Sequence, residues 1–445
     1  MTTSLPRLAG LTTLFVSLVI PAIHAQQPGP GEPLTLVEAM ARAGREAASV
    51  ELADLGLRQA RLQVSEARAG FLPRVDVSEA WQRGDQPVFA FGSLLAQRRF
   101  TAADFDVNRL TRPDPLNNFR AAVTVEQTLF DGALRARLRM ARLAHAVSER
   151  QRQRSERDAM TAAASAYGEV LRFEAMRQSA EAAEAAASAD RERAERRRDA
   201  GLVTDADLLA VSVHLAEVRA RRIGAAAEEQ VARAELNLAM GAPLDSRFML
   251  TPVAEVDPAE PLAGLETEAL RARPDLQVAE LRRELAESAV DQVRATFLPQ
   301  VVFRGGLEWN GGNFGQRAQS WVIGTEIRLN VFAGLADRAQ LARAAVARQT
   351  SDVRAREAAD RVRLEVRAAH ARVEAARATV TVAESAIDQA REGQRIVRDR
   401  YDGGLADIVA VLRAAEALLD AEAQAIAASA ALTVHHARLI AAVGR

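Results

Sequence analysis

The sequence contains no cysteine and no lysine, and aromatic residues make up only 4% of its 445 residues. Without cysteine the chain can form no disulfide, no thiolate zinc site and no lipid anchor on an N-terminal cysteine. The 58 basic residues are balanced by 59 acidic ones, so the strongly basic surface typical of nucleic-acid binding is missing. Few aromatics beside abundant Ala, Arg and Glu indicate long helices rather than an ordinary globular enzyme.

Residues that carry catalysis or bind metals are also scarce. The six His are scattered, and His435 and His436 are neighbours that point to different faces of a helix. The stretch NGGNFG at 310–315 lacks the Lys of a phosphate-binding loop and joins two predicted strands. We therefore expect no catalytic residue, no metal and no cofactor.

The first 25 residues have the pattern of a signal peptide. Arg7 is their only charged residue, an apolar run follows from Leu8 to Ile20, and Ala25 is a plausible cleavage point. The run has about 13 residues, too few to cross a bilayer. No later stretch approaches the roughly 18 consecutive apolar residues of a membrane-spanning helix. The sequence thus predicts export, with residues 1–25 removed, and no transmembrane helix.

Proline is absent from two long tracts, between Leu116 and Ala242 and between Gln300 and Arg445. Because proline disrupts helix interiors, these tracts can form very long helices, at about 134–199 and 336–400. Each helix would be roughly 100 Å long at 1.5 Å per residue. Rods of this length need neighbours to cover their apolar stripes, as in coiled coils.

The sequence also repeats itself. Four landmarks recur in the same order: AGFLPRVDV at 69–77 and ATFLPQVVF at 295–303, LFDG at 129–132 and VFAG at 331–334, AGLV at 200–203 and GGLA at 403–406, LAMG at 238–241 and AAVG at 441–444. We expect two copies of one plan, helix, strand, loop, strand, very long helix, turn and helix. The copies would occupy residues 26–240 and 262–445, joined by a linker at 241–261. The first copy has a longer loop, at 86–118.

Most aromatic residues lie where the pattern changes from helical to alternating. Fourteen of the 19 fall in residues 71–132 and 297–332. Apolar and polar residues alternate there with period two, which predicts strands with one apolar face. We expect four strands, at about 73–83, 119–130, 299–310 and 321–332. Each is about as long as a tilted membrane strand, with Trp81, Trp309 and Trp321 as interface anchors.

Two interpretations of these strands remain open. They could form a soluble sheet packed on helices, or they could cross a membrane. Four strands cannot close a barrel, since the smallest membrane barrels have eight, and open edges cannot face lipid. Membrane strands therefore require several copies of the chain.

Together, these features resemble the outer membrane efflux protein (TolC) family. The match is carried by LTLVEAM at 34–40, FLP at 71–73 and 297–299, LFDG at 129–132, VFAG at 331–334, and the turns at 201–202 and 404–405 with Tyr401. The resemblance implies a mainly α fold with a β-barrel part, in which a homotrimer builds one 12-stranded barrel in outer membrane lipid. The helices would continue the barrel as a periplasmic tunnel. A passive exit duct of this kind works with a periplasmic adaptor and an inner membrane pump or secretion ATPase.

The resemblance also assigns roles to the two turns that follow the long helices. Docking on the adaptor is expected at Gly201, Leu202, Val203, Thr204, Gly404, Leu405 and Ala406. Family members often close the tunnel tip with carboxylates, but the corresponding positions are Ala410 and Arg413 in this chain. We expect the aperture to involve Asp205, Asp207, Tyr401, Asp407 and Arg413 instead, and Arg413 could pair with one of these acids.

The loop at 86–118 is a second departure from the family pattern. As a hairpin loop it would face the outside of the cell, either folded over the barrel mouth or as an ordinary surface loop. The alternative function is a soluble periplasmic coiled-coil scaffold, without any membrane strands.

Overall fold

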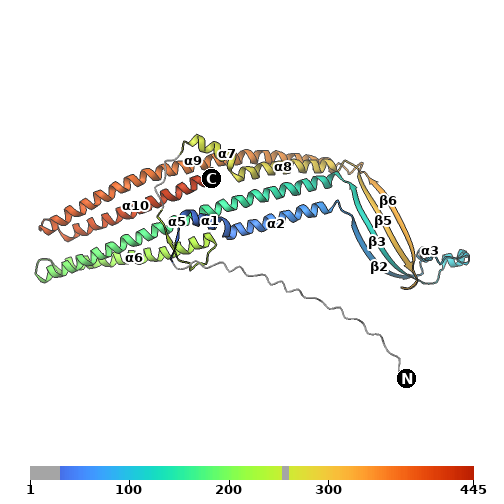
Figure 1. Cartoon of the computed structure of the whole chain (residues 1–445), viewed down its shortest axis with the longest axis horizontal. Helices are drawn as coiled ribbons and strands as arrows, with labels where there is room; N and C mark the ends of the chain where they lie inside the picture. Colours follow the sequence, from blue (N-terminus) through green and yellow to red (C-terminus); the bar gives the residue numbers. More distant parts are fainter. Residues whose placement is uncertain (1–30, 253–259) are drawn as a thin grey trace, which may run out of the picture.

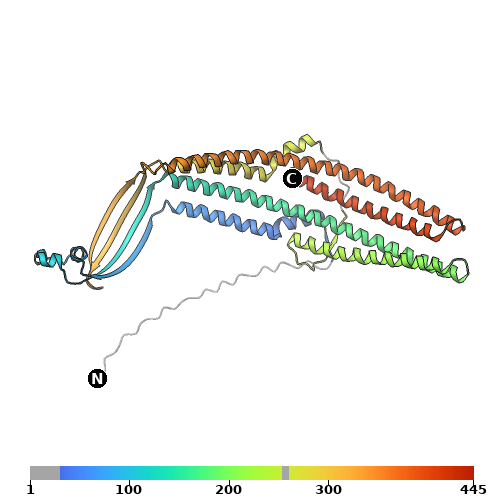
Figure 2. The same ribbon diagram turned by 180° about the vertical axis from the view of Figure 1, so that it is seen from behind.

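The computed structural model describes residues 31–252 and 260–445. The predicted signal peptide lies outside the described residues, as does part of the predicted linker, 253–259. The molecule is long and narrow, with a sheet at one end and two helical hairpins at the other (Figures 1 and 2). It is mainly helical, as predicted.

The two halves of the chain have the same order of major elements. The first half contains α1 (Leu36–Glu46), α2 (Ala48–Ala69), β2 (Arg74–Gly84), β3 (Leu116–Phe130), α5 (Gly132–Asp199) and α6 (Asp205–Met240). The second contains α7 (Leu262–Ala272), α8 (Pro274–Ala295), β5 (Gln300–Gly311), β6 (Ala318–Arg328), α9 (Ala336–Asp402) and α10 (Ile408–Val443). Short elements also occur, namely β1 (Glu32–Leu34), α3 (Pro87–Ala96), η1 (Ala102–Phe105), α4 (Val107–Thr111) and β4 (Phe248–Leu250). The long helices α5 and α9 have 68 and 67 residues, and α6 and α10 have 36 each.

Local sequence explains where the long helices begin and end. Asp131 caps α5, because its carboxylate accepts hydrogen bonds from the backbone N–H groups of Ala133 and Leu134. Each long helix ends at a turn with a glycine in the left-handed region, Gly201 with φ +70° and Gly404 with φ +74°. Both glycines therefore reverse the chain as the sequence predicts.

The large sheet has the strand order β2-β3-β5-β6, and all its neighbours are antiparallel. β6 ends at Arg328, although the alternating pattern predicts a strand to residue 332. Arg328 pairs with Gln300, the first residue of β5, so the residues after it have no partner strand. β6 therefore ends where its partner strand β5 ends, although the alternation of apolar and polar residues continues beyond Arg328.

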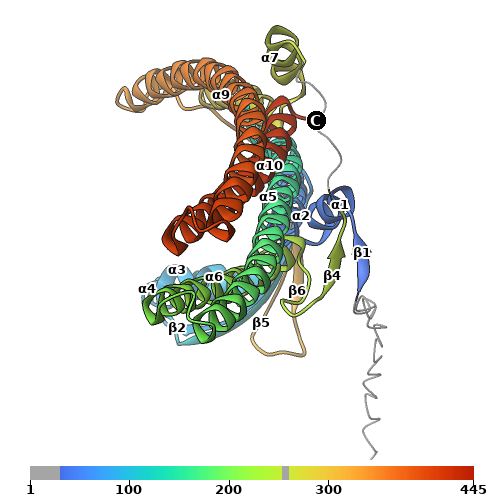
Figure 3. The same ribbon diagram turned by 90° about the vertical axis from the view of Figure 1, so that its left-hand side faces the viewer.

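A wall of four helices continues from the sheet. Next to the sheet, the order is α2, α5, α8 and α9, and towards the hairpins α6 and α10 take the places of α2 and α8. Only α5 and α9 run the whole length (Figure 1). Viewed along the long axis, the wall is an arc (Figure 3).

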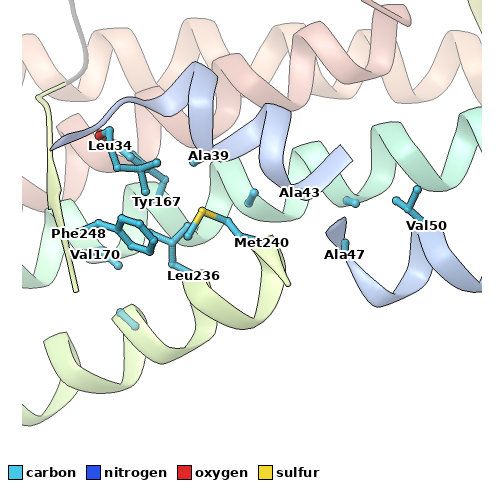
Figure 4. Close-up of a cluster of buried hydrophobic side chains, with 13 residues drawn as sticks. Leu34, Ala39, Ala43, Ala47, Val50, Tyr167, Val170, Leu236, Met240 and Phe248 are labelled. Carbon is cyan, nitrogen blue, oxygen red and sulfur yellow. The ribbon is translucent and has the colours of Figure 1, made fainter. Parts of the chain in front are cut away.

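The most developed apolar core lies halfway along the wall, where α1, α5 and α6 meet (Figure 4). Leu34, Tyr167, Leu236 and Met240 are each at most 1% exposed there. The Tyr167 hydroxyl lies 2.8 Å from the carbonyl oxygen of Leu34 and 2.6 Å from that of Thr251. It thereby binds the small parallel sheet of β1 and β4 to the long helix α5.

Among the described helices, α10 alone has the length and apolar composition to cross a membrane. No single apolar run in its sequence is long, because acidic and polar residues interrupt it, and this is why the sequence predicts no such helix. α10 packs along α9 and α5, and it buries Ile408, Val411 and Val434. In this fold α10 is a helix of the wall.

Candidate functional site

One face of the large sheet is polar. Residues that pair across neighbouring strands share a face, and the face alternates along each strand. By this register Arg120, Glu126, Arg304, Glu308 and Glu326 lie on the same side. Arg120 forms an ion pair with Glu308, and Arg304 bridges Glu126, at 3.2 Å, and Glu326. The charged ladder crosses three strands and suits a face in contact with water.

The opposite face is mainly apolar and uncovered, and its charged residues, Glu79 and Arg83, lie in the half of β2 farther from the helices. Its side chains include Val75, Val77, Trp81, Val123, Leu307, Trp321, Ile323 and Ile327. Val77 is 77% exposed, Trp321 69% and Ile327 71%. An apolar surface of this extent marks contact with a membrane or a partner, since proteins dissolved in water rarely expose one.

The three predicted interface tryptophans lie on this apolar face. Trp81 pairs with Phe119, Trp309 with Ala121, and Trp321 with Leu307, which in turn pairs with Val123. They therefore occupy three successive same-face rows, in the half of the sheet farther from the helices. Trp81 and Trp321 are exposed, whereas Trp309 is half-buried.

Both edge strands of the large sheet have a free side in the described structure. β2 and β6 each have one strand neighbour in the described structure. The outer helices of the wall, α2 and α6 on the β2 side and α9 on the β6 side, expose rows of apolar side chains. On α9 these are Val346, Val353, Leu364 and Val382, and on α2 and α6 they are Leu52, Leu55, Leu62, Leu209, Val213, Ile223, Val231 and Leu238.

The two helical tips carry the predicted docking residues. Leu202 is 69% exposed at the first tip and Leu405 73% at the second. Gly201, Thr204 and Gly404 are also exposed, whereas Val203 and Ala406 are half-buried. The tips thus offer two similar turns, each with one exposed leucine beside a glycine.

Two of the three predicted aperture acids, Asp207 and Asp407, serve as helix caps, and Asp205 lies in the first turn of α6. Thr204 and Asp207 form a capping box at the start of α6, and the Asp407 carboxylate accepts a hydrogen bond from the backbone N–H of Ala410 at 2.8 Å. Arg413 is exposed, and within the described residues it forms no ion pair with Asp205, Asp207 or Asp407. Such a pairing of Arg413 is therefore not present in the protomer. The spacing Thr-x-x-Asp at 204–207 is the signal that predicts a cap instead.

Contacts between the two hairpins join them near the tips. Arg398 of α9 lies 2.6 Å from Asp190 of α5, whose side chain is only 15% exposed. Arg197 lies 3.5 Å from Asp402, and its guanidinium stacks 4.7 Å from the centre of the Tyr401 ring. The predicted aperture residue Tyr401 thus packs between the hairpins, against a small cluster that includes Val211 and Ile408. Asp190, Arg197 and Arg398 could not be predicted from the sequence, because they lie far from their partners along the chain.

Within the first hairpin, ion pairs hold α5 and α6 together. Arg219 and Arg222 of α6 lie 2.9 and 2.7 Å from Glu184 of α5. The hydrogen bond from Arg219, together with the charge of Arg222, holds the pKa of Glu184 below its ordinary value. No group of three or more His, Asp or Glu side chains within 31–252 and 260–445 is arranged to hold a metal ion.

The chain matches the family model described as "Outer membrane efflux protein" over residues 41–242 and 265–445. Its fold is similar to that of the CmeC outer membrane channel of Campylobacter jejuni, with 17% identity and a TM-score of 0.79 over 92% of this chain and 85% of that chain. It is also similar to that of the outer membrane protein VceC of Vibrio cholerae, with 22% identity and a TM-score of 0.74 over 92% of this chain and 96% of that chain. A third similar fold is that of the MtrE outer membrane channel of Neisseria gonorrhoeae, with 19% identity and a TM-score of 0.72 over 92% of this chain and 88% of that chain. No curated protein sequence matches the chain.

Proposed function

The chain belongs to the outer membrane efflux protein family, and from this premise we propose that it is the passive exit duct of a tripartite efflux or type I secretion assembly. Membership of a family of outer membrane channels agrees with the expectation that the chain is not an enzyme. In the proposal, the apolar face of the sheet contacts outer membrane lipid, with Trp81, Trp309 and Trp321 at the interface. The polar face lines the lumen, and the helices extend into the periplasm as a tunnel. The N-terminal 25 residues would direct export.

The open edges of the sheet support a closed ring of several copies. Since the four strands alternate in direction, β6 of one copy runs antiparallel to β2 of the next. Unpaired backbone groups cannot face lipid, so the ring must close. Three copies would form a 12-stranded barrel, within the range of known membrane barrels.

The apolar rows on the helices support the same ring. In the proposed homotrimer, the exposed row on α9 packs on the row of α2 and α6 of the next copy. The two rows lie on helices at opposite edges of the wall. Each copy can therefore contact one neighbour through α9 and the other through α2 and α6, which gives a head-to-tail ring. We further propose that the two halves, 26–240 and 262–445, are copies of one plan, joined at 241–261, because their major helices have nearly equal lengths.

The single observation that carries the proposal is the sheet with one charged face, one apolar face and two free edges. It is tested by separating cell membranes and measuring the oligomeric state in mild detergent. We expect trimers in the outer membrane fraction. Monomers recovered from the soluble periplasm without detergent would contradict the duct and favour the coiled-coil scaffold.

The links between the hairpins imply that the tunnel tip is held narrow. We expect Arg398→Glu to widen it, because the new carboxylate faces Asp190 instead of neutralising it. Single-channel conductance of purified trimers in planar bilayers should rise several-fold.

Arg395→Glu is the matched control. Arg395 lies one turn away, but it pairs within its own helix, with Glu392 and Asp399, both at 2.7 Å. Its replacement makes the same change of charge without breaking a link between hairpins, so conductance should stay near the wild-type value. Equal conductance in both variants would contradict the role of Asp190 and Arg398.

A further inference from the structure

The loop between β2 and β3 is folded rather than extended. Its residues form α3, η1 and α4, which lie beyond the end of the sheet that is farthest from the helical wall (Figure 1). Phe100 joins these pieces, since its ring stacks edge-on against Phe91 at 4.9 Å and Phe105 at 5.1 Å between centroids. Stacked aromatic rings therefore hold α3 and η1 together, although the Phe105 ring is 66% exposed.

A chain of buried amides ties this loop to the polar face of the sheet. The Gln97 side-chain amide donates to the carbonyl oxygen of Asn117 at 2.8 Å and to Asn118 Oδ1 at 3.1 Å. Asn118 in turn donates to Asn310 Oδ1 at 3.0 Å. Gln97, Asn118 and Asn310 are 5%, 6% and 2% exposed. The register places Asn118 and Asn310 on the same face as Arg120 and Glu308. Since buried amides are costly to leave unpaired, they determine on which side of the sheet the loop lies.

The loop reaches across to the last strand as well. Arg98, with φ +54°, donates from its guanidinium to the carbonyl oxygen of Gln319 at 2.9 Å. The neighbouring Arg99 lies over Gly312, where a Cβ atom would come within 2.7 Å of its guanidinium nitrogen. Gly312 therefore leaves room for Arg99, the third residue after α3.

α3 has an apolar surface that its own chain does not cover. Val88 is 88% exposed and Leu95 50%, although the loop is tied to the polar face of the sheet. If that face lines a lumen, as proposed above, lipid cannot reach this surface. In such a lumen, the groups nearest to this surface are the β2–β3 loops and the β5–β6 turns of the neighbouring copies.

We propose that α3 contacts the α3 helices of the two other copies, so that three loops close the outer end of the duct. The proposal rests on the trimer. Dimensions support it: twelve strands about 4.8 Å apart and tilted by about 40° enclose a ring roughly 24 Å across. Three helices about 10 Å wide fill an opening of that size. The duct then has a narrow outer mouth in addition to its periplasmic tip.

The absence of cysteine makes the contact directly testable. A single Val88→Cys in the full-length chain can form a disulfide only with another copy. Upon copper-catalysed oxidation of outer membranes, we expect a disulfide-linked dimer from this variant. Val77→Cys is the matched control, because Val77 is also a highly exposed valine, at 77%, but lies on the apolar face of β2. It should stay unlinked.

A second variant tests the attachment of the loop. Gln97→Ala removes the amide that joins α3 to β3, so the loops should loosen, cross-linking through Val88→Cys should fall, and conductance should rise several-fold. Gln316→Ala, in the exposed turn between β5 and β6, should change neither quantity.

The outcomes separate this inference from the duct itself. Intact trimers in which Val88→Cys stays unlinked, or in which both cysteine variants link equally, would overturn the contact between α3 helices and leave the duct in place. Labelling of Val88→Cys by a lipid-soluble reagent without linkage would mean that lipid covers α3. Absence of trimers would instead refute the proposed function, and this inference with it.

Discussion

Leu405→Glu is expected to abolish efflux while trimers still reach the outer membrane. Leu405 is 73% exposed at the tip of the second hairpin, where we propose that the adaptor docks. Burying a leucine in an interface contributes about 2 kcal/mol, and burying an unpaired carboxylate costs several more. Docking should therefore weaken by a factor of order 10³. The measurement is the resistance of cells to the exported compound, together with the amount of trimer in the outer membrane.

Leu244→Glu provides the control for this experiment. Leu244 is 57% exposed, and it lies after the end of α6, far along that helix from the tips. The same substitution there should leave efflux unchanged. Wild-type resistance in Leu405→Glu, with normal amounts of protein, would remove the docking role of this turn.

Gly241→Ala is expected to be the most destabilising single-methyl substitution in the helical wall. Gly241 ends α6 with φ +73°, and a Cβ atom there would lie 2.2 Å from the carbonyl oxygen of Glu46, the last residue of α1. The left-handed backbone alone costs alanine about 1 kcal/mol, and backbone atoms of α1 must also move. We expect a loss of roughly 3 kcal/mol, at the upper end of ordinary substitutions. The measurement is the midpoint of thermal loss of helical circular dichroism in detergent, which should fall.

Gly224→Ala is the opposite case within the same helix. No atom lies within 4 Å of the Cβ position at Gly224, which is in the interior of α6. Since alanine favours helix interiors over glycine, the variant should be more stable by roughly 0.5–1 kcal/mol. If both variants lowered the midpoint equally, the close approach between Gly241 and Glu46 would not be the cause.

The long helices and the strands are predictable because their signals are local. Missing prolines mark α5 and α9, and period-two alternation marks β5 and β6. The strand ends are less predictable, because they depend on partners. Leu329 and Val331 continue the alternation of β6, but no residue of β5 lies opposite them.

Features that depend on distant contacts could not be predicted. β1 and β4 have three residues each, too few for any period, and they pair across more than 200 positions of the chain. Asp190 and Arg398 are 208 residues apart, so only the fold brings them together. α3 is only 10 residues long, and its place is determined by the amide of Gln97, which looks like any polar loop residue in the sequence.

The exchange of helices halfway along the wall has a mechanical consequence. At that level α2 gives way to α6 and α8 to α10, so only α5 and α9 cross it without a break. However, α1 and α7 pack across the two breaks, each within a buried apolar core, so the joint is reinforced where two of the four helices are interrupted. The helices beyond it, of 36 residues each, are lever arms of about 54 Å. A rotation of about 5° at this joint would move the tips by about 5 Å, so the two cores that stabilise the joint also determine how precisely the tips are positioned.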